Sequence, residues 1–244
     1  MFNANPILNT KSFYTAPAYR KKTFSISGAI NKSIILIVFT TLIASFTWYY
    51  GETIHFRFPK YWFTISGLLA LLTAIIIRYK RHLAGVLSFV YALFKGVFLG
   101  AISSNYEMQF NGIVAQAVVL TLLVFFIMLL LYKFRIITVS KKLRAIVMAS
   151  TTAIFTIYFI SFMLYLFNLP PIPYIHGNGI IGIIFSVFVA VTASFHLLLD
   201  FSFFEKCRNY KFDINMEWYA ALYMLVSVIW QYLSLLRLLR KVRN

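Results

Sequence analysis

Seven long apolar stretches dominate this sequence and restrict what it can fold into. They are Ser33–Tyr50, Tyr61–Ile77, Leu83–Ser103, Gly112–Tyr132, Ala145–Phe167, Ile180–Leu199 and Trp218–Leu239. A hydrocarbon layer of ~30 Å is crossed by a helix of roughly 20 apolar residues. Because amides in lipid must be satisfied within the protein, and because the runs are continuous rather than alternating, they predict helices and not a β-barrel. We expect an all-α polytopic membrane protein with seven transmembrane helices.

The composition leaves no room for a second, soluble domain. Only 12% of the 244 residues are charged, against about 25% in soluble proteins. We expect three parts: a cytoplasmic N-terminal arm over residues 1–32, a transmembrane domain over 33–239 and a basic C-terminal tail over 240–244. The lipid bilayer is then the main partner.

The positive charge of the chain predicts its orientation. The net charge of +17 does not indicate a nucleic-acid partner, because the basic residues gather at alternate helix ends. They lie before the first run (Lys11, Arg20, Lys21, Lys22, Lys32), after the second (Arg78, Lys80, Arg81), after the fourth (Lys133, Arg135, Lys141, Lys142, Arg144) and after the sixth (Lys206, Arg208, Lys211). The other connectors hold only Arg57 and Lys60. This positive-inside pattern predicts a cytoplasmic N-terminus.

The basic C-terminus conflicts with that pattern. A seventh crossing would place Arg240, Lys241 and Arg243 outside. Either the last helix crosses against its charge, or one late helix is re-entrant and the C-terminus returns to the cytoplasm.

Acidic residues in membrane segments are costly and are therefore candidates for function. The chain has six acids, and Asp200 closes the sixth apolar run with His196 four residues earlier on the same helical face. A carboxylate and an imidazole so placed can share a proton. The alternative is that Asp200 is an interfacial anchor beside Lys206 and Arg208.

Polar residues also follow one face of the last helix. Tyr223, Ser227, Gln231 and Ser234 recur at helical spacing, which predicts that this helix faces protein or water rather than lipid. Hydrogen bonding between helices would use the same residues. In the third run, Lys95 lies too deep to reach the interface easily, so we expect it to point inward towards a partner.

Enzyme chemistry is not indicated. Ser186 or Ser194 with His196 as base would suggest an intramembrane hydrolase, but the Gly-x-Ser-x-Gly elbow is absent. The four histidines show no HExxH spacing. We expect no catalytic residues, no bound metal and no cofactor.

Several motifs together resemble the Bax inhibitor-1-like membrane protein family, in its bacterial branch. In chain order they are NPIL (Asn5–Leu8), INKS (Ile30–Ser33), YALFKGVFLGAIS (Tyr91–Ser103), IHGNGIIGIIFSVF (Ile175–Phe188), LLLDFSFFE (Leu197–Glu205), MEWYAAL (Met216–Leu222) and YLSLLRLLRK (Tyr232–Lys241). The resemblance implies seven helices with the last one central between two triplets, and location in the bacterial inner membrane.

The resemblance also implies a pH-sensitive calcium leak channel. Its gate would be a carboxylate pair on the last two helices, near the cytoplasmic end. Asp200 matches the first acid, but Ser227 stands at the position of the second, and Lys95 stands where an acid is usual. Glu205 and Arg237 belong to the same motifs and are possible supporting residues.

We therefore expect a gate formed by Asp200 with His196, Lys95 and Ser227, with at most weak transport or binding of Ca²⁺. With only one acid at the gate, its partners would be basic. The alternative function is a non-conducting regulator that binds a membrane-anchored quality-control protease or another membrane protein.

The charge pattern makes a direct prediction of topology. In a Cys207→Ser background, a membrane-impermeant maleimide added to intact cells should label a cysteine at Asn178 and should not label one at Thr10 or Ser140. Labelling at Ser140 would reverse the orientation.

Overall fold

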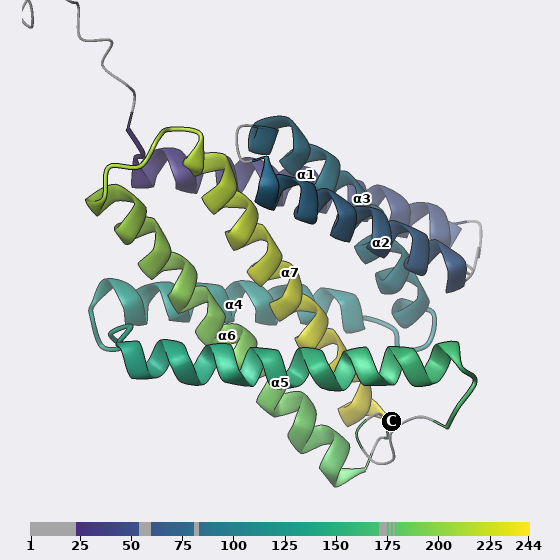
Figure 1. Ribbon diagram of the computed structural model, residues 1–244. Coiled ribbons are helices and arrows are strands. Elements are labelled where there is room, and N and C mark those ends of the chain that lie inside the picture. The colour runs from purple at the N-terminus through teal and green to yellow at the C-terminus, as the bar shows by residue number, and fades with distance from the viewer. Residues whose placement is uncertain (1–22, 54–59, 81–82, 171–174, 176, 178) are drawn as a thin grey trace, which may run out of the picture.

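The fold is a bundle of antiparallel helices (Figure 1). The computed structural model describes residues 23–53, 60–80, 83–170, 175, 177 and 179–244. The expected N-terminal arm up to residue 22, and Arg57, lie outside the described residues. The helices are α1 (Ile26–Thr53), α2 (Lys60–Tyr79), α3 (Ala84–Glu107), α4 (Ile113–Lys133), α5 (Lys141–Leu166), α6 (Ile180–Asn209) and α7 (Met216–Arg243). Six of them are long and apolar enough to cross a membrane, and α2 carries a shorter apolar segment. The predicted all-α polytopic membrane fold is confirmed.

Most of the helices extend beyond the apolar runs from which they were predicted, and three of the extensions bear on the rest of the structure. α1 begins at Ile26 rather than Ser33, and α7 continues to Arg243, so most of the expected C-terminal tail is the last turn of a helix. α6 continues past Leu199 to Asn209. Residues 200–209 contain no Gly or Pro, and Lys206 and Arg208 in the last turn complement the negative end of the helix dipole.

The helix ends define two faces of the bundle. We call the face at which α1, α3, α5 and α7 begin the N-terminal face, and the opposite face the C-terminal face.

α7 ends at the C-terminal face. There the Lys241 ammonium donates to the carbonyls of Ile175 and Gly182 at 2.7 and 2.9 Å, and Arg243 donates to the carbonyl of Asn111 at 2.9 Å. The last helix therefore runs without a break from one face of the bundle to the other, and its basic end is held by backbone carbonyls of two connectors and of α6.

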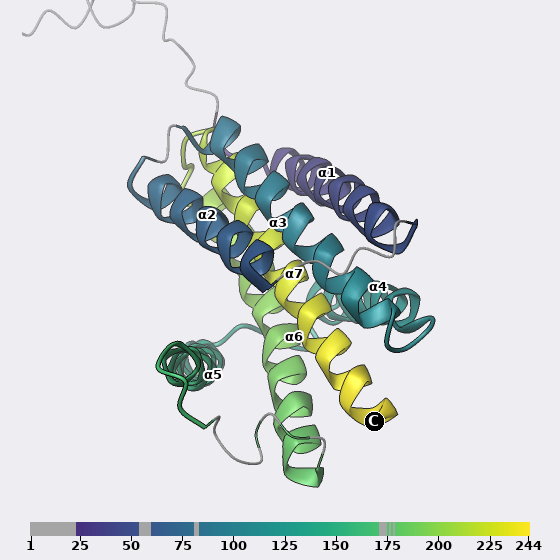
Figure 2. The same cartoon turned by 90° about the vertical axis from the view of Figure 1, so that its right-hand side faces the viewer.

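α7 is the interior helix of the bundle. It has the largest buried share of the candidate membrane spans, and its apolar residues belong to all three hydrophobic clusters of the core. Figures 1 and 2 show it between α1 and α3 on one side and α4 and α6 on the other. By contrast, α5 lies at the periphery and packs mainly against α6. The central place predicted for the last helix is confirmed.

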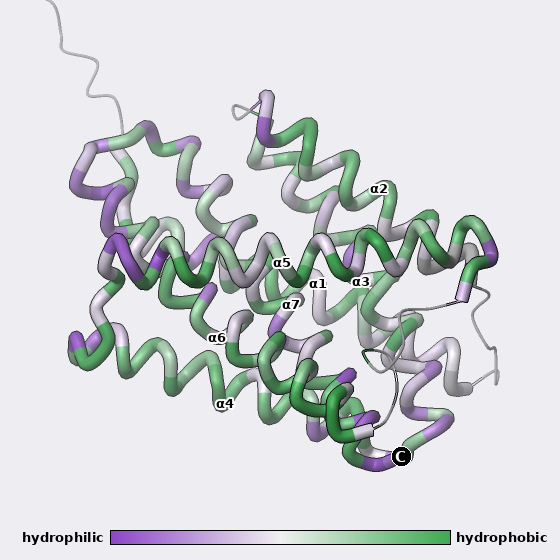
Figure 3. Tube along the Cα trace, turned by 60° about the horizontal axis from the view of Figure 1, so that its bottom comes forward, coloured by the Kyte–Doolittle hydropathy of each residue, from purple (hydrophilic) through white to green (hydrophobic). Residues whose placement is uncertain are grey.

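The polar stripe of α7 is buried along most of its length. Ser227, Gln231 and Ser234 are 2%, 1% and 2% exposed, whereas Tyr223 is 43% exposed. Hydrophilic residues otherwise gather at the helix ends, as Figure 3 shows. Within the spans, hydroxyls such as those of Ser33 and Thr40 donate to the carbonyl four residues earlier, which satisfies them without water.

Two glycines allow α3 to pack closely against α1. A Cβ at Gly96 would lie 2.7 Å from Cβ of Ile43, and one at Gly100 would overlap the carbonyl of Ala44 and the side chain of Thr47. This is the small-xxx-small pattern by which membrane helices approach one another. The contact of α1 with α3 therefore depends on the absence of these two side chains.

Gly100→Ala should destabilise the protein because the new methyl group meets the backbone of α1. Overpacking of this kind costs about 1–3 kcal/mol, visible as a lower melting temperature of the detergent-solubilised protein. Gly67→Ala is the control, since its Cβ would make ordinary contact with Phe98 at 3.7 Å. Equal melting temperatures for the two variants would contradict this account.

Candidate functional site

The candidate site is a polar cluster buried between α6 and α7. Asp200 on α6 is only 2% exposed, and it lies nine residues before the end of the helix. At 1.5 Å per residue this is about 14 Å of helix rise. Asp200 is therefore buried inside the bundle rather than at the end of α6, where Lys206 and Arg208 lie.

Asp200 is grouped with His196 and Ser227. One carboxylate oxygen, Oδ1, lies 4.0 Å from Nδ1 of His196, and the same nitrogen lies 3.3 Å from the Ser227 hydroxyl. That hydroxyl also lies near the Asp200 carboxylate. The other carboxylate oxygen, Oδ2, is buried with no hydrogen-bond partner. The Trp230 ring packs edge-on against the imidazole, with ring centroids 5.6 Å apart.

A second polar contact joins the same helices towards the C-terminal face. The Ser194 hydroxyl donates to Oε1 of Gln231 at 3.2 Å and also lies 2.8 Å from the carbonyl of Ala190. Nε2 of Gln231 is buried and has no partner. Ser234 bonds within α7, to the carbonyl of Trp230. The buried stripe of α7 thus faces polar side chains of α6.

Lys95 does not join this cluster. Its ammonium lies over the Phe98 ring, 4.8 Å from the centroid, and no ion pair joins it to Asp200 among the residues that the structure describes. α3 packs mainly against α1 and α2, whereas Asp200 lies on α6 near Ser227 of α7. The structure therefore does not bring together Lys95 and Asp200.

The other predicted residues lie around the cluster rather than in it. The Tyr223 hydroxyl is 3.4 Å from that of Tyr219, and its ring packs against Phe203. Arg237 lies over the Tyr158 ring of α5, 4.9 Å from the centroid. Glu205 is exposed near the end of α6.

The sequence of this chain matches a known protein family over almost its whole length. Residues 5–244 match the family described as Bax inhibitor 1 like. The chain belongs to this family. Comparison with curated proteins gave no match. The Bax inhibitor 1 like match covers the whole transmembrane bundle, including both helices of the candidate site.

In this member of the Bax inhibitor 1 like family, the site contains one carboxylate and one imidazole. Ser227 lies near Asp200. It occupies the position at which the family resemblance led us to expect a second acid. A calcium site takes six to eight oxygen ligands, and the described residues include no group of three or more metal-binding side chains. At 4.0 Å, the Asp200 carboxylate and the His196 imidazole are close enough for the charge of one to affect the other, but they share no direct hydrogen bond.

An ion pair at the N-terminal face was not predicted from the sequence. The Lys32 ammonium lies 2.7 Å from Oε2 of Glu217, which is 4% exposed, and Oε1 accepts from the backbone N–H of Ser25 at 2.8 Å. The contact joins INKS to MEWYAAL, two of the motifs that carried the family resemblance. An acid in the first turn of α7 was the available signal, but its partner is 185 residues away.

Loss of Lys32 should be strongly destabilising because it leaves the Glu217 carboxylate buried and unpaired. Breaking such a pair from one side costs about 3–5 kcal/mol. Lys32→Met should therefore lower the melting temperature in detergent more than the double variant Lys32→Met/Glu217→Gln does. Additive effects in this double-mutant cycle would mean that the two side chains are not coupled.

Proposed function

We propose that this Bax inhibitor 1 like protein is a cation leak pathway, for Ca²⁺ in particular, whose permeability is set by protonation of the cluster of Asp200, His196 and Ser227. The observation that carries the proposal is the Asp200 carboxyl group, which is buried between α6 and α7 with one oxygen unpaired. A buried polar atom without a hydrogen-bond partner destabilises a protein by about 1–3 kcal/mol. A contribution to stability therefore does not explain why an aspartate stands at this position.

The proposed gate works by a change of charge at the contact of the two helices. In the closed form, the cluster joins α6 to α7 through Ser227 of α7, which lies beside both His196 and Asp200 of α6. A proton gained or lost by either titratable group changes the attraction across this contact. Because Ser227 replaces the second acid expected from the family resemblance, the imidazole is the second titratable group.

The alternative is a non-conducting regulator that binds another membrane protein, such as a membrane-anchored quality-control protease. It is supported by two cations within the membrane spans, Lys95 and Arg237, which rest on aromatic rings. Such charges repel Ca²⁺, and a single carboxylate offers little to offset them.

Asp200→Asn tests the proposed gate in liposomes that contain an entrapped calcium dye. The variant keeps the shape of the side chain but loses its charge and titration. Calcium entry at neutral pH should rise several-fold, to about the highest level that the wild type reaches at any pH, and should no longer change with pH. The dye fluorescence is measured over a series of external pH values.

The control is Asp213→Asn, which removes an acid from the connector between α6 and α7, outside the cluster. Its calcium entry should keep the pH response of the wild type. Wild-type permeability and pH response in Asp200→Asn would refute the proposed gate. No calcium entry with any of the three proteins would favour the regulator instead.

A further inference from the structure

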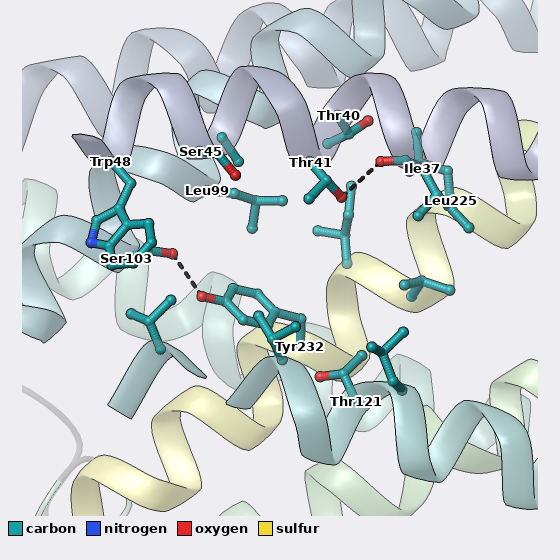
Figure 4. A pocket seen from close by; sticks show the side chains of 16 residues that line it. Ile37, Thr40, Thr41, Ser45, Trp48, Leu99, Ser103, Thr121, Leu225 and Tyr232 are labelled. Carbon is teal, nitrogen blue, oxygen red and sulfur yellow. Dashed lines mark hydrogen bonds between the residues drawn. The ribbon is translucent and has the colours of Figure 1, made fainter. Parts of the chain in front are cut away.

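A cavity of about 200 Å³ lies between α1, α3, α4 and α7. Its lining is mainly aliphatic, with Leu99 from α3, Val114 from α4 and Ile229 from α7 among the buried residues of the wall. Figure 4 shows Thr40, Thr41, Ser45 and Trp48 along α1 on one side, and Leu225 and Tyr232 of α7 on the other. The cavity is separate from the cluster at Asp200, whose residues do not line it.

The cavity opens towards the lipid. Its deep wall is formed by residues such as Leu225, which is 1% exposed. The lining residues that are exposed come from two helices: Thr41 and Ser45 from α1, and Val118 and Leu122 from α4. Neighbouring residues on the same helices form the outer surface of the bundle, including Leu42 at 63% and Val119 at 64% exposed. The mouth is therefore continuous with the surface that meets the bilayer.

The cavity is long and narrow. Its lining on α1 runs from Ile37 to Trp48, which is about 16 Å of helix rise at 1.5 Å per residue. That length is close to half of a ~30 Å hydrocarbon layer. The Trp48 end lies five residues before the end of α1, so the cavity occupies the half of the membrane towards the C-terminal face. A volume of about 200 Å³ over this length suits an extended chain rather than a compact ring system.

Water is a poor occupant for this space. The hydroxyls of Thr40, Thr41 and Thr121 donate to carbonyls of their own helices, and Ser103 and Tyr232 are hydrogen-bonded to each other at 2.7 Å. A buried water needs two to four polar partners, and an apolar cavity of about 150 Å³ stays dry and binds small hydrophobic molecules.

A polar group lies at the end nearest the membrane surface. Nε1 of Trp48 is buried and has no hydrogen-bond partner, although a buried indole N–H usually finds one. Tryptophan is also typical of the membrane interface. A lipid ester oxygen at this depth would satisfy the indole while the hydrocarbon extends towards Ile37.

We propose that this cavity binds one acyl chain of a phospholipid from the leaflet at the C-terminal face. The chain enters between Thr41 and Ser45 of α1 and Val118 and Leu122 of α4. It then lies along α7 beside Leu225, Val228 and Ile229. These residues flank Ser227, so the bound chain supports the segment of α7 that carries part of the candidate gate.

A phospholipid with a diazirine near the end of one acyl chain tests the proposal in nanodiscs that contain the full-length protein. After irradiation, the labelled residues are mapped by mass spectrometry. In the wild type, labelling should concentrate on the inner wall of the cavity, at Ile37, Leu225 and Val228. Thr41→Trp fills the mouth and should lose this inner labelling. Leu42→Trp places the same side chain on the next residue, outside the cavity, and should keep it.

Thr41 and Leu42 are both exposed on α1, so neither substitution disturbs the core. Ser45→Trp is a second variant, which closes the same mouth one helical turn further along α1. Inner labelling that persists in both mouth variants would overturn the proposal. So would wild-type labelling confined to outward residues such as Leu42 and Val119. Cross-linking of two protein chains through the mouth, in place of lipid labelling, would assign the surface to a second copy and would also overturn it. None of these results depends on calcium permeability.

Discussion

The hydrocarbon of the bilayer offers no hydrogen bonds, and the position of α7 follows from that constraint. A helix with serine, glutamine and tyrosine along one face is stable in lipid only if that face meets polar groups of the protein. α6 supplies them, with Ser194, His196 and Asp200 opposite Gln231 and Ser227. The apolar remainder of α7 packs into the hydrophobic clusters around it. The bundle is in this sense assembled around the polar contact of α6 with α7.

The same constraint explains how much of the fold could be predicted. The long apolar runs indicate the helices, and the basic residues at every second connector indicate that successive helices run in opposite directions. The polar stripe identified α7 as the interior helix, but Tyr223 at its start is exposed. A spacing of four residues exceeds the helical repeat of 3.6, so two such steps turn the side chain by about 80° around the helix. The stripe therefore leaves the protein interior at one end.

The candidate site could be predicted only in part. Asp200 and His196 were identified because acids are rare in this chain, and four residues place them on one face of a helix. The burial of Asp200 within a helix was missed because hydropathy falls at Leu199 while the helix itself continues to Asn209. Lys95 was expected to meet an acid, whereas it rests on Phe98. Which helices are neighbours is a property of tertiary packing, and it cannot be read from spacing within one helix.

The connection at the N-terminal face limits how α6 and α7 can separate. Thr23 pairs with Asp213 of the α6–α7 connector, and the Phe24 ring packs against Phe204 of α6. Glu217, in the first turn of α7, also binds Lys32 of α1 and the backbone N–H of Ser25 just before that helix. With both helices held there, a parting of α6 from α7 would be a hinge rotation about residues 210–215. Its displacement would be smallest at the N-terminal face and would grow with distance from it, past Asp200 to Gln231 and on to the C-terminal face.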